Sequence, residues 1–250
     1  MKKVLVEQDE HDVVWATFNR PERRNAIDYD TMEELLEIIE AVEQSDARAL
    51  VLTGTGKAFC SGGDLGVFHS LRTEEEAYAM LKKMGDILYK LMILSKPTIA
   101  LLNGTAVGGG CEIATACDFR FASANAHVGF VQGTLAITTG WGGATMLYEK
   151  LPHHAAMQML SSARRYSAEE AKNVGFLHEV ISGEERKFCE KWISENLVMN
   201  ESVLTAYKQA AVRKWNESNI KYRMEEEIKN CARLWESDHH HAAVQSFLSR

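Results

Sequence analysis

The chain has 250 residues, a formal net charge of −7, and 46% hydrophobic and 25% charged residues. A chain of this length and composition buries enough apolar surface to fold without disulfides or a structural metal. The negative charge argues against non-specific nucleic-acid binding, although a small anionic ligand needs only a local cluster of donors.

The cysteines and the apolar runs indicate a cytoplasmic protein that does not associate with membranes. The five cysteines include no CxxC pair, so we expect buried free thiols and no metal site. The apolar run near the N-terminus is too short for a signal peptide. No stretch approaches the roughly 18 apolar residues of a membrane-spanning helix.

The first half of the chain alternates between strand and helix patterns. Apolar residues at helical spacing predict helices over 29–44 and 77–94. A strand is predicted over 13–18, and apolar runs predict buried strands over 49–53 and 98–102. This order is typical of an α/β fold.

The second half is predominantly helical. A short apolar helix over 111–117 precedes a strand-like run over 119–121, and a capping box predicts a helix start at 167–170. Amphipathic helices are expected over 183–196 and 202–214. We therefore predict one α/β body with a helical C-terminal region that docks on the body or on a neighbouring subunit.

Two segments share the order of buried strand, glycine-rich turn and helix start. The first turn is Ser61-Gly62-Gly63-Asp64, and the second is Gly108-Gly109-Gly110. Glycine permits tight turns and close approach of a ligand, and the first amides of a helix are unpaired and lie at its positive end. We predict that the amides of Ser61 and Gly109 form an oxyanion hole. For each turn taken alone, a tight packing corner is the alternative.

Further motifs accompany these turns in a fixed order. They are Asn19-Arg20-Pro21, Asn25-Ala26, Ala58-Phe59-Cys60-Ser61-Gly62-Gly63-Asp64-Leu65, Lys96-Pro97, Asn103-Gly104, Gly108-Gly109-Gly110-Cys111-Glu112, Cys117-Asp118 and Gly140-Trp141-Gly142-Gly143. In this order and spacing the chain resembles the crotonase superfamily, the enoyl-CoA hydratase/isomerase family. The similarity extends from about residue 3 to the C-terminus.

The resemblance implies a fold, a ligand and an assembly. It implies a crotonase-like ββα spiral over residues 1–195 that carries an acyl-CoA site, and a helical trimerisation region over 196–250, the two forming one continuous domain. It also implies a homotrimer or homohexamer, and no cofactor beyond the CoA moiety of the substrate. The resemblance places CoA against Arg24, Ala26, Ala58, Phe59, Ser61, Gly62, Gly63, Asp64, Leu65 and Gly109.

Two side chains decide which proton chemistry is expected. Glu112 begins the helix behind the second turn, and a buried carboxylate has a raised pKa that suits a general acid or base. Stabilisation of the helix dipole is the alternative role. Hydratases of the family use a second glutamate, and spacing back from Gly140 places Gln132 at that position. Glutamine forms hydrogen bonds but does not exchange protons at neutral pH.

These residues predict an acyl-CoA lyase in which Glu112 is the acid/base and Gln132, Ser61 and Gly109 complete the catalytic site. The first alternative is a decarboxylase of the ethylmalonyl- or methylmalonyl-CoA type, because the segment ending at Gln132 and the bulky Trp141 resemble that branch. The second alternative, motivated by Gln132, is a CoA-thioester-binding protein without efficient catalysis.

Overall fold

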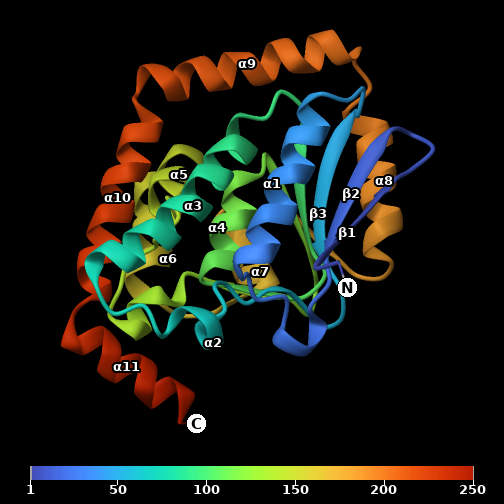
Figure 1. Ribbon diagram of the computed structural model, residues 1–250. Coiled ribbons are helices and arrows are strands. Elements are labelled where there is room, and N and C mark those ends of the chain that lie inside the picture. The colour runs from blue at the N-terminus through green and yellow to red at the C-terminus, as the bar shows by residue number, and fades with distance from the viewer. Residues whose placement is uncertain (1, 250) are drawn as a thin grey trace.

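The computed structural model describes residues 2–249 (Figure 1). Its strands form two sheets. The six-stranded sheet has the order β1-β2-β3-β5-β7-β10, and the four-stranded sheet has the order β4-β6-β8-β9. The strands of the larger sheet are β1 (Val4–Gln8), β2 (Val13–Phe18), β3 (Ala49–Gly54), β5 (Thr98–Leu102), β7 (Phe119–Ser123) and β10 (Glu179–Ile181). Those of the smaller sheet are β4 (Ala58–Cys60), β6 (Thr105–Val107), β8 (His127–Gly129) and β9 (Tyr166–Ser167).

The chain winds as a spiral because the strands from β3 to β8 alternate between the two sheets. β3, β5 and β7 are parallel neighbours in the larger sheet, while β4, β6 and β8 are parallel neighbours in the smaller one. Antiparallel pairing occurs between β1 and β2 and between β8 and β9. Each turn of the spiral therefore adds one strand to each sheet, which confirms the predicted crotonase-like ββα architecture.

Helices cover both faces of the larger sheet. The helices are α1 (Tyr29–Glu43), α2 (Leu65–Phe68), α3 (Glu74–Ile93), α4 (Gly109–Ala116), α5 (Gly143–Lys150), α6 (His153–Ser162), α7 (Ala168–Asn173), α8 (Glu185–Asn196), α9 (Glu201–Glu217), α10 (Ile220–Trp235) and α11 (Asp238–Leu248), with 3-10 turns η1 (Pro21–Arg23) and η2 (Val131–Leu135). α8 packs on one face of the sheet through Cys189 and Ile193. The main core lies on the other face and includes α1, α3 and α4.

The C-terminal helices extend around this body. α9 crosses one end of the molecule, α10 runs back along α3 and α5, and α11 lies at the opposite end against η2 (Figure 1). Because α10 buries its apolar face, the C-terminal region docks on its own body as one of the two predicted arrangements. The division at 195/196 and the trimerisation role of 196–250 stay predictions, and residue 250 lies outside the described part.

Several local predictions agree with the structure and others need correction. The capping box at Ser167 is present and starts α7, and all five cysteines are buried and free. The predicted helix over 77–94 begins earlier, at Glu74, because Thr73 and Glu76 form a capping box that the apolar pattern does not reveal. Within residues 2–249, no helix is long and apolar enough to cross a membrane.

Candidate active site

The two glycine turns lie side by side because they follow neighbouring strands. β4 and β6 are parallel, so the chain leaves both strands at the same edge of the smaller sheet. Gly62 (φ +93°) and Gly108 (φ +56°) adopt backbone conformations that favour glycine. A Cβ atom on Gly62 would lie 3.0 Å from the amide nitrogen of Gly109. The turns therefore approach each other as closely as glycine allows.

The hydrogen bonds at the first turn correct one prediction. The Ser61 N–H donates to the carbonyl oxygen of Arg24 at 3.1 Å. The prediction that the Ser61 amide is unpaired is therefore wrong. Asp64 N–H donates to Ile27 O at 2.8 Å, and Gly62 N–H points to Cys60 Sγ at 3.3 Å. Among the described residues, the Gly63 amide has no acceptor.

The second turn supplies another unpaired amide. Gly109 is the first residue of α4, and its N–H has no acceptor within residues 2–249. The amides at a helix start carry partial positive charge. Gly63 and Gly109, rather than Ser61 and Gly109, therefore offer the pair of free donors at the junction of the turns.

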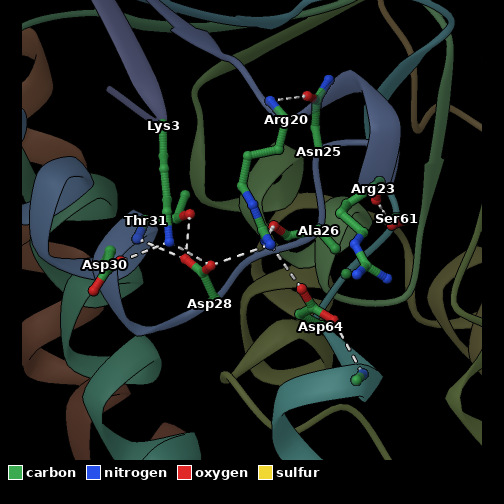
Figure 2. A network of polar contacts seen from close by, with 12 residues as sticks. Lys3, Arg20, Arg23, Asn25, Ala26, Asp28, Asp30, Thr31, Ser61 and Asp64 are labelled. Carbon is green, nitrogen blue, oxygen red and sulfur yellow. Dashed lines mark hydrogen bonds and ion pairs between the residues drawn. The ribbon is translucent and has the colours of Figure 1, made fainter. Parts of the chain in front are cut away.

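A polar network fixes the loop before α1 against the first turn (Figure 2). Arg20 forms ion pairs with Asp64 at 2.9 Å and with Asp28 at 3.2 Å, and donates to Ala26 O. Asn25 donates its Nδ2–H to Ala58 O at 2.8 Å. Ion pairs and hydrogen bonds therefore join the loop to the turn, and hydrogen bonds between groups of opposite charge are strong.

The predicted CoA-contacting residues divide into accessible and enclosed positions. Arg24 is exposed, whereas Ser61 and Leu65 are half-buried. Phe59 is fully buried and packs edge-to-face on Phe18, with ring centroids 5.7 Å apart. Asp64 is also buried, and besides Arg20 it accepts from Gly66 N–H at the start of α2. The side chains of Phe59 and Asp64 therefore pack within the turn and leave little of their surface exposed.

Glu112 is buried in α4, and both of its carboxylate oxygens accept hydrogen bonds. Oε2 accepts from Trp141 N–H at 2.8 Å and from Gly143 N–H at 2.9 Å. Oε1 accepts from Gln132 Nε2–H at 2.8 Å and from Gly140 N–H at 3.3 Å. The carboxylate thus faces the loop before α5, where its main visible role is to hold that loop.

Two kinds of influence act on the pKa of Glu112. Burial raises the pKa to about 8, and the negative charge of Glu227 raises it as well. The N–H groups of Trp141, Gly140 and Gly143 lower it. In this structure both oxygens are occupied by N–H donors, two on each.

Gln132 lies in η2 with its two amide atoms in different surroundings. Its Nε2 donates to Glu112, and its Oε1 is the buried side-chain oxygen that has no hydrogen-bond partner among the described residues. A Cβ atom on Gly108 would lie 3.9 Å from the amide carbon of Gln132. The structure therefore brings Gln132, Glu112 and the second glycine turn together, as predicted.

Sequence reasoning missed Glu227 in α10. Its carboxylate accepts from Thr139 Oγ1–H at 2.5 Å, from Ala144 N–H at 3.0 Å and from Thr145 N–H at 2.7 Å. Burial raises the pKa of Glu227. A detectable signal existed, because Glu227 is three residues after Met224 and four before Cys231, on the buried face of the helix.

Comparison with known proteins identifies the family. The family model described as "Enoyl-CoA hydratase/isomerase" matches residues 8–250. The chain belongs to the enoyl-CoA hydratase/isomerase family. A short-chain-enoyl-CoA hydratase from Clostridium acetobutylicum is 31% identical over 100% of this chain and 96% of its own length.

A second group of relatives carries a different name. The ethylmalonyl-CoA decarboxylase from Homo sapiens is 32% identical over 82% of this chain and 68% of its own length. The one from Bos taurus is also 32% identical, over 78% of this chain, which spans 65% of that protein. The relatives of this chain are therefore named for two different reactions.

Solved structures of family members have the same fold. An enoyl-CoA hydratase from Bacillus halodurans superposes with a TM-score of 0.89 at 21% identity, covering 98% of this chain and 100% of that one. An enoyl-CoA hydratase/isomerase from Xanthobacter autotrophicus Py2 also gives 0.89, at 24% identity, covering 99% and 93%. These structures establish the crotonase-like fold.

Proposed function

We propose that this protein is an acyl-CoA lyase that stabilises a thioester enolate with the amides of Gly63 and Gly109. The observation that carries the proposal is the pair of unpaired N–H groups on two turns in contact with each other. Donors arranged in advance around a developing oxyanion stabilise the transition state and cost no reorganisation during the reaction. These two N–H groups would donate hydrogen bonds to the thioester oxygen.

Decarboxylation of a short 2-carboxyacyl-CoA, of the ethylmalonyl or methylmalonyl type, fits the side chains best. Breaking the bond between C2 and the carboxylate leaves its electron pair on the thioester enolate and releases CO2, so no residue has to remove a proton. This suits a site in which Glu112 is held by N–H donors and Gln132 does not exchange protons. A proton from water then completes the acyl-CoA product at C2.

Hydration of an enoyl-CoA is the second candidate. The pKa of Glu112, raised to about 8 by burial, lies in the range in which a carboxyl group acts as acid or base near neutral pH. The full-length similarity to a short-chain hydratase supports this reaction as well. It requires Glu112 to exchange at least one loop N–H for a water molecule.

We also propose the residues that contact CoA and the assembly that the chain forms. CoA would contact the backbone of the 58–65 segment and the exposed Arg24, whose charge suits a phosphate. The acyl-CoA substrate is then the sole ligand, with no further cofactor, and residues 196–250 contribute to a homotrimer or homohexamer.

One set of assays separates these reactions. The purified protein is incubated with ethylmalonyl-CoA, methylmalonyl-CoA and crotonyl-CoA, while CO2 release and loss of the enoyl absorbance are followed. We expect CO2 release from at least one malonyl-type thioester and little hydration. Hydration without CO2 release would support the second candidate, and binding of all three without turnover would instead support a CoA-thioester-binding protein.

A further inference from the structure

The indole ring of Trp141 lies against both glycine turns. A Cβ atom on Gly109 would lie 2.1 Å from Cζ3 and 2.4 Å from Cη2 of this ring. A Cβ atom on Gly63 would lie 3.6 Å from Cζ2. The six-membered part of the indole therefore lies against both residues whose amides are unpaired, and Trp141 as a residue is buried, with an exposed fraction of 4%.

Two acidic side chains hold the loop that carries Trp141. Glu112 from α4 accepts from the amides of Gly140, Trp141 and Gly143. Glu227 from α10 accepts from Thr139 Oγ1 and from the amides of Ala144 and Thr145. Glu112 thus holds the middle of the segment 139–145, and Glu227 holds both of its ends.

We propose that Trp141 is a specificity-determining residue that restricts the site to short acyl groups, with Glu227 as the positioning residue that fixes the ring. The inference rests on the proposed function in one respect, namely that the thioester oxygen lies at Gly63 and Gly109. The acyl chain extends from the carbonyl carbon that bears this oxygen, and it would meet the indole within a few atoms. A long chain fits only if the ring moves, and the two carboxylates oppose that movement.

The first test measures binding of thioesters that cannot react. Affinities for butyryl-CoA and octanoyl-CoA are determined by calorimetry with the wild type, Trp141→Leu and Trp141→Phe. In the wild type we expect octanoyl-CoA to bind more weakly than butyryl-CoA, by about tenfold or more. Trp141→Leu should reverse this order, because each methylene that becomes buried adds about fourfold in affinity. Trp141→Phe should lie between the two.

A matched control separates this effect from the loss of any buried indole. Trp215→Leu removes a tryptophan of α9 that is also buried, and it should leave the ratio of the two affinities unchanged. Equal binding of both thioesters to the wild type, or an unaltered ratio in Trp141→Leu, would overturn the role of Trp141. Because the measurement involves no turnover, the result stands even if the reaction is not decarboxylation. Failure of the wild type to bind any thioester would refute the proposed function together with this inference.

The second test concerns Glu227. Glu227→Gln places an amide N–H₂ where the carboxylate accepts three donors, so the loop loosens and the affinity ratio should move several-fold toward that of Trp141→Leu. Glu149→Gln is the control, since the Glu149 side chain pairs with Arg223 at 2.6 Å and joins α5 to α10, whereas among the described residues its carboxylate forms no hydrogen bond to the segment 139–145. An identical ratio in Glu227→Gln and Glu149→Gln would show that Glu227 does not position Trp141.

Discussion

At Glu112, burial and hydrogen bonding act in opposite directions on one carboxyl group. Burial raises its pKa from 4.5 to about 8, so between these values the folded protein binds a proton that the unfolded chain has released. The free energy of unfolding contributed by Glu112 should therefore fall as the pH rises from about 4.5 to about 8. We expect the difference between wild type and Glu112→Gln, measured by urea denaturation, to change by up to about 1.4 kcal/mol per pH unit across this window. A constant difference would mean that the four N–H donors keep the carboxylate ionised throughout.

The side-chain oxygen of Gln132, which has no hydrogen-bond partner among the described residues, leads to a prediction about activity. Gln132→Glu would place a second carboxyl group about 2.8 Å from Glu112, judging from the present Nε2–Oε1 distance. Two carboxyl groups at this separation share a proton, and the pair gains the acid/base capacity that glutamine lacks. Crotonyl-CoA hydration should rise by about tenfold or more, whereas Gln132→Met, similar in size but without polar atoms, should give no gain. No gain in Gln132→Glu would indicate that the pocket does not hold the attacking water.

At the scale of elements, what the sequence predicts depends on how local the interaction is. The buried strands β3 and β5 are evident from their continuous apolar runs, whereas the three-residue strands β4, β6 and β8 are too short to carry a pattern. The turns themselves are predictable because glycine marks them. The sequence does not predict which amide remains unpaired. The hydrogen bond from Ser61 N–H to Arg24 O joins residues that are distant in sequence. The sequence also does not predict that Glu112 and Glu227 accept hydrogen bonds from the same loop, because this depends on how α10 docks.

The contact between α4 and β4 is a prediction at this scale. A Cβ atom on Gly110 would lie 2.1 Å from the carbonyl oxygen of Cys60, a backbone atom that has little freedom to move. Gly110→Ala should therefore push α4 away from the first turn and lower the free energy of unfolding by about 1–3 kcal/mol. Gly133→Ala is a milder control, because its Cβ would meet only the Ala163 side chain, at 3.2 Å. Equal stability of the two variants in chemical denaturation would contradict the tight packing of the turns.

For the whole molecule, the exposed apolar surface predicts where copies of the chain would meet in the proposed homotrimer or homohexamer. Val198, Met199, Val203 and Tyr207 lie between the end of α8 and the middle of α9, with exposed fractions of 58%, 53%, 39% and 72%. Large exposed apolar groups that cluster in this way are typical of protein interfaces, and they fall within the predicted trimerisation region. Met199→Asp combined with Tyr207→Glu should therefore convert the assembly to a monomer in light scattering, while circular dichroism stays the same because neither side chain belongs to the core. Val6→Glu changes an apolar side chain of β1 that is 49% exposed, and it should leave the assembly intact. If the wild type and the α9 double variant have the same oligomeric mass, the subunits meet through another surface, and a monomeric wild type would contradict the proposed assembly.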